Sequence, residues 1–239
     1  MRIAIINLDV SVDRLKKCSE QLSNYGHDFE RISAVDIRVN ENAGLIETYS
    51  VRQNYFGYYK TLKPGEIGCY LSHRKLWQKM VDEDIDQILV LEDDFELKAD
   101  LHNVFEFVSS INPSDWDIIK LGEIPKKRIK KILQSKGELQ LISFKKAPQG
   151  TYAYIISKKA ARQMLAFSSP FFRPIDVDMQ HFWEHKQKVL GILNNPFIHI
   201  DGESILKTMG NRDKTKRRLF VKFYTTFYEK LMLLFGSST

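Results

Sequence analysis

Cysteine is scarce in this chain. Cys18 and Cys69 are the only two cysteines among 239 residues, and they are too far apart to form a CxxC pair. This argues against a disulfide-built secreted scaffold and against a zinc ribbon, since both need several closely spaced cysteines. Two cysteines without a framework fit a reducing compartment, so we expect a cytoplasmic protein.

Long apolar runs are also lacking. No stretch reaches the about 18 uninterrupted apolar residues typical of a membrane-spanning helix. The apolar N-terminal segment meets Asn7 and Asp9 before it attains the length of a signal peptide. We therefore expect a chain that is neither exported nor threaded through a bilayer.

Charge is distributed unevenly. The net charge is +6, and residues 212–230 hold seven basic side chains against two acidic ones. A basic tail on a nearly neutral domain indicates a partner surface, whereas an evenly basic domain would favour nucleic acid, which we do not expect to be a partner. With 43% hydrophobic and 28% charged residues the chain should fold. We predict one domain over residues 1–208 and a basic tail over 209–239.

Strand-like and helix-like segments alternate along the domain. Short apolar runs predict strands at residues 3–8, 29–36, 88–91, 116–121, 139–144 and 150–156. Apolar spacing of three and four predicts helices near 13–25, 65–81, 101–110 and 158–167, and we interpret basic residues 126–131 as a loop. This order predicts an α/β fold with a mostly parallel sheet and helices on both faces, in which ligands bind at the carboxyl ends of the strands.

Three acidic residues, Glu92, Asp93 and Asp94, directly follow the strand at 88–91. Adjacent carboxylates at a strand end repel each other unless a cation or several donors compensate, and oxygen ligands suit Mg²⁺ or Mn²⁺. Alternation along an extended chain puts Glu92 and Asp94 on the same side. The alternatives are a cap for the next helix, and metal-assisted hydrolysis or nucleotidyl transfer.

Several ordered motifs give the sequence a family resemblance. They are Ile6-Asn7-Leu8 with Arg14, Glu30-Arg31 with Ala34-Val35-Asp36, residues 62–69 leading to Leu71-Ser72-His73, Leu91-Glu92-Asp93-Asp94, and Pro174-Ile175-Asp176. In order and spacing they resemble glycosyltransferase family 25 over about residues 1–205. That family includes bacterial lipooligosaccharide galactosyltransferases and collagen galactosyltransferases.

The resemblance implies a Rossmann-like GT-A type fold, a UDP-sugar donor that is typically UDP-galactose, Mn²⁺ or Mg²⁺ at the acidic motif, and inversion at the anomeric carbon. We therefore expect an inverting glycosyltransferase that moves a hexose onto a lipooligosaccharide or another surface glycan. Glu92 and Asp94 are the expected metal ligands. His199, which follows an apolar strand-like segment, is a candidate third ligand, with a structural role as the alternative.

Five residues are candidates for contact with the donor. Asn7 lies at the end of the first strand, Arg14 lies one helical segment later, and both are placed to meet the nucleotide and its phosphates, as is Asp93. Arg14 could equally form a surface ion pair. Ser72 and His73 lie on the predicted helix at 65–81 and are expected to approach the donor, although His73 also fits a satisfied core histidine.

Inversion needs a carboxylate that accepts the proton of the attacking hydroxyl, and Asp176 and Asp178 are the candidates. We expect the helix of this region to follow them, through residues 180–183. The alternative is that one of the two caps that helix. The resemblance favours Asp176, as base or as metal-site residue, without separating these roles.

The basic tail has an aromatic helical face. Its members at helical spacing are Phe220, Phe223, Tyr224, Phe227, Leu231, Leu234 and Phe235. Flanking lysines and arginines make this typical of an interfacial helix on anionic lipid, with docking on the domain or a homodimer contact as alternatives. A lipid-linked oligosaccharide acceptor would suit an enzyme held at the inner face of the cytoplasmic membrane. The non-enzyme alternative is a lipid- or nucleic-acid-binding module, which leaves the acidic motif unexplained.

Overall fold

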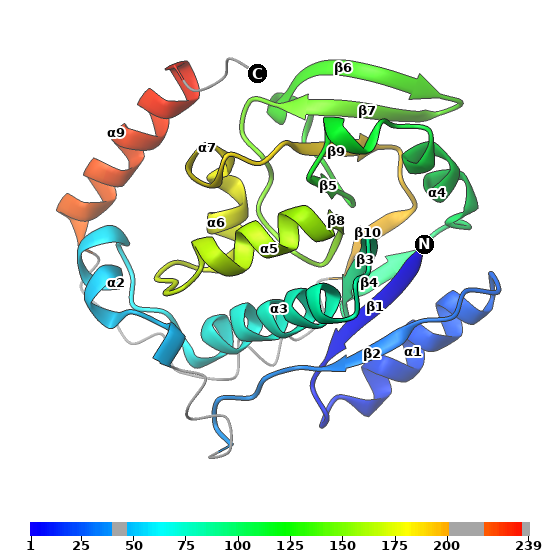
Figure 1. The fold of residues 1–239 in the computed structure, drawn as a ribbon, viewed down its shortest axis with the longest axis horizontal. Coiled ribbons are helices and arrows are strands. Elements are labelled where there is room, and N and C mark those ends of the chain that lie inside the picture. The colour runs from blue at the N-terminus through cyan, green and yellow to red at the C-terminus, as the bar shows by residue number, and fades with distance from the viewer. Residues whose placement is uncertain (40–46, 201–217, 236–239) are drawn as a thin grey trace.

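Two sheets organise the computed structural model, which describes residues 1–39, 47–200 and 218–235 (Figure 1). The strands are β1 (Arg2–Asn7), β2 (Glu30–Ser33), β3 (Gln87–Glu92), β4 (Phe95–Leu97), β5 (Ile118–Lys120), β6 (Ile129–Lys136), β7 (Leu139–Phe144), β8 (Ala153–Ser157), β9 (Val189–Leu193) and β10 (Phe197–His199). Eight strands form the larger sheet in the order β2-β1-β3-β8-β5-β9-β7-β6, and β10 pairs with β4. In the larger sheet β7 and β8 run opposite to the other strands. The predicted α/β fold with a mostly parallel sheet is confirmed.

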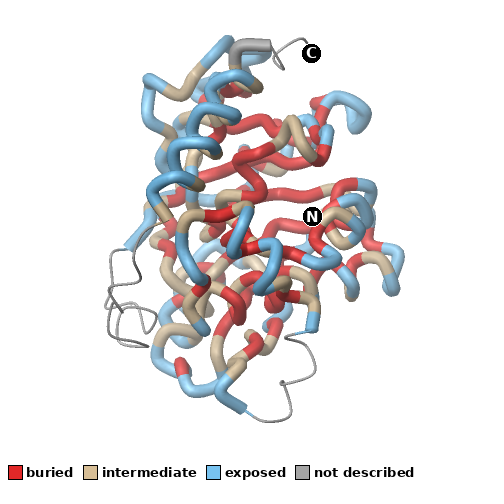
Figure 2. The backbone as a smooth tube through the Cα atoms, turned by 90° about the vertical axis from the view of Figure 1, so that its left-hand side faces the viewer, coloured by how far each residue is buried: buried red, intermediate tan, exposed pale blue. Residues whose placement is uncertain are grey.

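Helices cover both faces of the larger sheet, as predicted. The α-helices of the described residues are α1 (Val12–Ser23), α2 (Val51–Gly57), α3 (Pro64–Asp82), α4 (His102–Ser109), α5 (Lys158–Phe167), α6 (Ile175–Gln180), α7 (Phe182–His185) and α9 (Leu219–Phe235). Ile3 and Ile5 of β1 pack with α1 and α4, whereas Ala4 and Ile6 pack with α3, α5 and α6. This division follows from the period of two in a strand, which sends alternate side chains to opposite faces. Figure 2 shows the buried residues running through the centre between these layers.

Strand pairing brings the predicted site together. β1 pairs in parallel with β3, with Ile6 opposite Glu92, so the carboxyl ends of the two strands meet. Asn7 therefore lies beside the acidic motif. In the second sheet β10 runs antiparallel to β4 with His199 opposite Phe95, which carries a histidine from the far end of the domain to Asp94.

The predicted basic loop at 126–131 is wrong in its second half. Ile129 begins β6, which extends to Lys136 at the edge of the sheet and pairs with β7. Its residues are mostly exposed, so the apolar alternation that predicts a strand is missing from the sequence. Lysines on an edge strand disfavour pairing with another chain.

The helix predicted to follow Asp176 and Asp178 begins earlier. Pro174 is the N-cap residue of α6, so both aspartates lie within the first helical turns. A proline that precedes a helix presets the backbone for it and needs no N–H there. The two carboxylates are therefore held on a helix, and they point to different neighbours.

Polar contacts dock α9 on the domain. Arg218 donates to the Asn54 and Tyr58 carbonyls, and Glu229 pairs with Lys146. Among the described residues, no helix is long and apolar enough to cross a membrane. The predicted domain boundary at residue 208 lies outside the described residues.

Candidate active site

A cavity of about 750 Å³, its open mouth included, lies where β1, β3 and α3 converge. The apolar wall of the cavity comprises Ile6, Leu8, Ala34, Val35 and Ile37, and the charged side chains of Asp36 and Arg38 line the cavity beside them. The acidic motif lines the cavity next to Ile6, and α3 contributes Cys69, Ser72 and His73. The cavity can therefore hold one ligand that carries both a flat apolar group and a charged group.

Asp93 is held by two of the predicted donor-binding residues. The Asn7 amide donates to its Oδ2 at 2.7 Å, and Arg14 pairs with its Oδ1 at 3.0 Å. Burial raises the pKa of Asp93, and the Arg14 charge and the Asn7 hydrogen bond oppose that rise. Arg14 also approaches Asp94 at 3.8 Å. Asn7 and Arg14 thus belong to the site because both contact Asp93. Their contact with a nucleotide stays a prediction.

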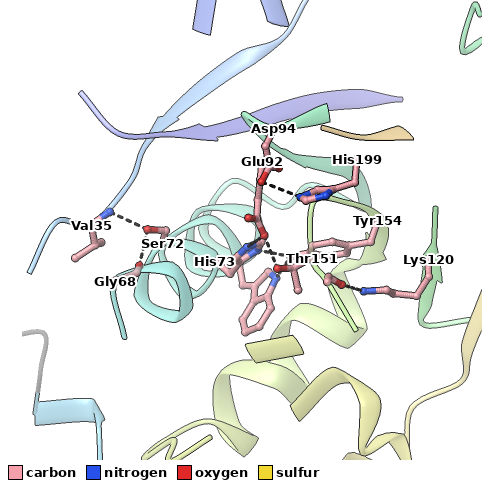
Figure 3. Close-up of polar contacts among 12 residues, drawn as sticks. Val35, Gly68, Ser72, His73, Glu92, Asp94, Lys120, Thr151, Tyr154 and His199 are labelled. Carbon is pink, nitrogen blue, oxygen red and sulfur yellow. Dashed lines mark hydrogen bonds and ion pairs between the residues drawn. The ribbon is translucent and has the colours of Figure 1, made fainter. Parts of the chain in front are cut away.

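Asp94 faces His199, as the metal-site hypothesis expects. The His199 Nε2 atom lies 3.2 Å from Oδ2 of Asp94 (Figure 3). The other carboxylate oxygen, Oδ1, is buried and has no hydrogen-bond partner among the described residues. Burial, together with the charge of Glu92, raises the pKa of Asp94 to about 6. A buried carboxylate oxygen without a partner beside an imidazole fits a divalent cation.

Glu92 turns toward α3 and β8. Its Oε1 lies 3.3 Å from His73 Nε2 and accepts a hydrogen bond from the Thr151 hydroxyl (Figure 3). Burial alone would raise the pKa of Glu92, but the hydrogen bond and charge of His73 bring it below its ordinary value. His73 is fully buried, and its Nδ1 lies 2.8 Å from the Tyr154 hydroxyl. His73 therefore orients Glu92, a role compatible with both interpretations made from the sequence.

The hydroxyl of Ser72 is used by the fold. It donates to the Gly68 carbonyl at 2.7 Å and accepts from the Val35 N–H at 2.8 Å (Figure 3). These bonds fix the segment after β2 against α3 and so shape the apolar wall. Ser72 lines the cavity, and its donor contact stays a prediction.

Asp178 is committed to a buried ion pair. The Arg173 Nε atom and the Tyr70 hydroxyl both donate to its carboxylate at 2.7 Å. Burial raises the pKa of Asp178, and the Arg173 charge opposes the rise. Arg173 continues the network to Glu184, at 2.6 Å. Both Asp178 oxygens thus have partners within the protein, which is typical of a structural carboxylate.

Asp176 is partly buried and feels the charge of Glu92 in the acidic motif. Its carboxylate accepts from the Val177 N–H at 2.8 Å and from the backbone of Gly150. Burial raises its pKa, and the charge of Lys120 opposes the rise. Of the two candidate bases, Asp176 is the one within electrostatic reach of both Lys120 and Glu92.

Lys120 and Thr151 are site residues that the sequence interpretation missed. Lys120 is 2% exposed, and its ammonium group donates to the Gly150 carbonyl (Figure 3). Burial lowers its pKa to about 8, while Asp176 and Glu92 act in the opposite direction. Lys120 therefore anchors Gly150, and the following residue, Thr151, donates the hydrogen bond that holds Glu92. A lysine inside the apolar run at 118–121 was the available signal.

An α/β sheet thus presents a carboxylate and a histidine at the edge of a cavity that lies at the carboxyl ends of β1 and β3. Residues 1–179 match the family described as "Glycosyltransferase family 25 (LPS biosynthesis protein)". The chain belongs to this family, which confirms the resemblance seen in the sequence.

Two curated relatives illustrate the range of the family. Procollagen galactosyltransferase 1 of Danio rerio is 31% identical over 188 residues, covering 74% of this chain and 30% of the relative. Inactive glycosyltransferase 25 family member 3 of Mus musculus is 32% identical over 124 residues, covering 49% and 20%. The chain thus spans less than a third of the length of these relatives.

Solved structures with a similar fold include galactosyltransferase LgtC in complex with donor and acceptor sugar analogs. Its TM-score is 0.48 at 12% identity, covering 85% of this chain and 88% of that chain. A glycosyltransferase involved in glycosylation of the major capsid of PBCV-1 has a TM-score of 0.45 at 12% identity, covering 87% and 96%.

Proposed function

We propose that this chain is an inverting, metal-dependent glycosyltransferase that moves galactose from UDP-galactose onto a lipooligosaccharide or another surface glycan. The observation that carries the proposal is the pair of Asp94 and His199: Asp94 lines the cavity, and its buried Oδ1 has no hydrogen-bond partner within the part of the chain that the structure describes. One relative is named inactive, so activity is inferred from these residues rather than from family membership alone.

The apolar and the acidic residues that line the cavity suit the base and the diphosphate of a nucleoside diphosphate. The apolar wall formed after β1 and β2 would take the base, and the acidic side would take the diphosphate together with Mn²⁺ or Mg²⁺. Asp94 and His199 would hold the cation, which when bound stabilises negative charge on the departing UDP. Arg14, at 3.0 Å from Asp93, lies close enough to the acidic motif to approach a phosphate oxygen.

Asp176 is the proposed general base. Its carboxylate would take the proton of the acceptor hydroxyl as that oxygen attacks the anomeric carbon from the face opposite UDP. The new glycosidic bond then forms while the bond from the anomeric carbon to UDP breaks, which inverts the configuration. The Gly150 backbone donates to the Asp176 carboxylate, and Lys120 of β5 donates to the Gly150 carbonyl. Asp178, paired with Arg173, is assigned to the structure of this helix.

A metal-dependent phosphohydrolase or nucleotidyltransferase would use a similar acidic edge. The family match over residues 1–179 favours sugar transfer instead. The two classes differ in their products, because a phosphohydrolase releases sugar phosphate and needs no glycan acceptor.

Donor binding provides the first test. UDP-galactose with Mn²⁺ is expected to raise the thermal unfolding midpoint, since a ligand at 100 times its dissociation constant adds about 2.7 kcal/mol of stability. Differential scanning fluorimetry with UDP-galactose, UDP-glucose, UDP-N-acetylglucosamine and GDP-mannose, each with Mn²⁺ or with a chelator, ranks the donors. Equal midpoints for all nucleotide sugars and for Mn²⁺ alone would contradict the proposal, and a preferred donor other than UDP-galactose would revise the sugar.

A membrane-facing surface is part of the proposal. The outer side of α9 exposes Phe220 (84%), Phe223 (73%) and Phe227 (59%), while Glu229 on the other side pairs with Lys146 of the domain. The neighbouring helix α2 (Figure 1) exposes Tyr55 and Phe56, and the Arg218 guanidinium lies 4.5 Å from the centroid of the Tyr55 ring. We define these five aromatic residues as the aromatic face.

Anionic lipid is the proposed occupant of the aromatic face. The neighbouring α9 lysines Lys222 and Lys230 are exposed, and they supply the positive charge that anionic headgroups attract. Such binding would hold the enzyme at the inner face of the cytoplasmic membrane, where a lipid-linked oligosaccharide acceptor would share its surface.

Substitution of the aromatic face tests this placement. The triple variant Phe220→Ser, Phe223→Ser and Phe227→Ser is expected to lose binding to vesicles that contain phosphatidylserine. Each lost phenylalanine removes about 1.5 kcal/mol of binding free energy, or roughly tenfold in affinity. The control, Ile132→Ser with Leu133→Ser, removes exposed apolar side chains from β6 and should bind normally. Unchanged sedimentation of the triple variant with vesicles would refute the proposal. A wild-type dimer that the triple substitution dissociates would assign the face to a second copy.

A further inference from the structure

A second group of metal-ligating side chains lies on the floor of the cavity. The ligand atoms of Cys69, His73 and Glu92 all lie within 4.8 Å of one another. We propose that these three residues form a binding site for Zn²⁺, separate from the cation pair Asp94 and His199, and that Zn²⁺ bound there inhibits the enzyme. The binding claim stands apart from the proposed function, and only the inhibitory consequence rests on it.

The spacing of the ligand atoms is close to that of a tetrahedral zinc site. Zinc bonds of about 2.0–2.3 Å place neighbouring ligand atoms roughly 3.3–3.8 Å apart. His73 Nε2 and Glu92 Oε1 already lie at 3.3 Å, so small side-chain rotations of Cys69 and Glu92 would complete the arrangement. The three residues line the cavity, which leaves a fourth position open to water or a ligand.

The surroundings of the three ligands are built to orient them. Tyr154 places its hydroxyl 2.8 Å from His73 Nδ1 and accepts a hydrogen bond from Trp77 at 3.1 Å. Thr151 contacts both remaining ligands, since its hydroxyl donates to Glu92 and also hydrogen-bonds the Cys69 thiol. Outer contacts of this kind fix ring orientation and ligand direction in metal sites.

Binding of Zn²⁺ requires a defined protonation state of His73 and the loss of one proton from Cys69. His73 would carry its proton on Nδ1, from which it donates to the Tyr154 oxygen, leaving Nε2 free for the cation. Cys69 would release its thiol proton to solvent, because the thiolate is the form that binds metal. Neither change needs an oxidant or a second ligand.

Ligand chemistry separates the two cation sites. A thiolate and an imidazole favour Zn²⁺ over Mg²⁺ and Mn²⁺, whereas carboxylate oxygens suit the harder ions. Zn²⁺ bound to Cys69 would also bind Glu92, whose negative charge otherwise raises the pKa of Asp94. The ion would also occupy part of the cavity proposed for the donor. Inhibition by Zn²⁺ in the presence of excess Mn²⁺ follows from that position.

Cobalt spectroscopy tests the site without any sugar transfer. Adding Co²⁺ to the metal-free chain is expected to produce a thiolate-to-cobalt charge-transfer band that Zn²⁺ abolishes and Mn²⁺ does not. Cys69→Ser should lose the band, and the matched Cys18→Ser should keep it, since Cys18 is the other cysteine and is buried on the inner face of α1. In Cys69→Ser, Zn²⁺ affinity by calorimetry should fall by more than the 10- to 100-fold typical of losing a supporting contact.

Each outcome bears on the proposal. A missing band in the wild-type chain, or a band that survives in Cys69→Ser, overturns the site. Zn²⁺ sensitivity is then compared as the ratio of transfer rates with and without Zn²⁺ in each variant, which should lie well below one in wild type and near one in Cys69→Ser. If no transfer occurs in any variant, the proposed function fails while the spectroscopic result stands.

Discussion

Replacing Asp94 with asparagine is expected to lower the rate of sugar transfer by on the order of 10³-fold, about 4 kcal/mol of transition-state stabilisation. Asp94 offers a buried oxygen that has no hydrogen-bond partner among residues 1–39, 47–200 and 218–235, and its neighbour His199 offers an imidazole nitrogen. The amide of asparagine keeps the shape of the side chain but removes the charge that would hold a divalent cation. Transfer rates at saturating donor and Mn²⁺ measure the loss.

The stability of Asp94→Asn should change in the opposite direction. The folded-state pKa of Asp94 is about 6, above the ordinary aspartate value of about 3.9. Ionisation therefore costs folding stability as the pH rises between these values, and asparagine escapes that cost. Chemical denaturation at neutral pH without divalent cations should find Asp94→Asn at least as stable as wild type. A site residue that destabilises the fold is retained for function.

The control for this prediction is Asp115→Asn, which changes an exposed aspartate of the turn before β5. It should leave both the transfer rate and Mn²⁺ binding unchanged. Full transfer by Asp94→Asn, or Mn²⁺ binding equal to that of wild type, would remove Asp94 from the metal site and with it the main support for the proposed function.

Asparagine substitutions at Asp176 and Asp178 are expected to have opposite consequences. Asp176→Asn should reduce transfer by about 10³-fold, within the range that a general base supplies, and should leave the fold intact. Asp178→Asn should cost about 3 kcal/mol of stability, because Arg173 and Tyr70 lose the buried charge that they surround. Urea denaturation and initial rates of the folded variants separate the two effects.

A pH profile adds a readout that a structural role would not change. A base must be ionised to act, so kcat/KM should rise with pH through the pKa of Asp176, which burial places above the ordinary aspartate range. Asp176→Asn should lose this rise, whereas folded Asp178→Asn should keep it. If Asp178→Asn lost the rise and Asp176→Asn kept it, the assignment of the base would be reversed.

Local pattern was enough for much of the fold. β1, β3 and β8 are short apolar runs, and α3 and α5 show apolar spacing of three and four, so burial alone specifies their type. β6 was missed because an exposed edge strand has no apolar alternation to reveal it. The start of α6 was misplaced because Pro174 is compatible with an extended segment as well as with a helix start.

The tail shows the same division. Its aromatic spacing predicted a helix, and α9 is that helix, yet spacing could not say which side meets the domain. Contacts of Arg218 and Glu229 with residues from other elements turn the side of Glu229 toward the domain and leave Phe220 and Phe223 exposed.

The sequence by itself determined that Glu92, Asp93 and Asp94 end a buried strand, because a short apolar run followed by charge has few other placements in a folded chain. Tertiary structure decided how the three carboxylates are used. Asp93 faces Arg14, Asp94 faces His199 and Glu92 faces His73, and these partners come from three different elements. Side-chain partners so far apart in sequence are set by strand register and helix packing, which no local pattern encodes.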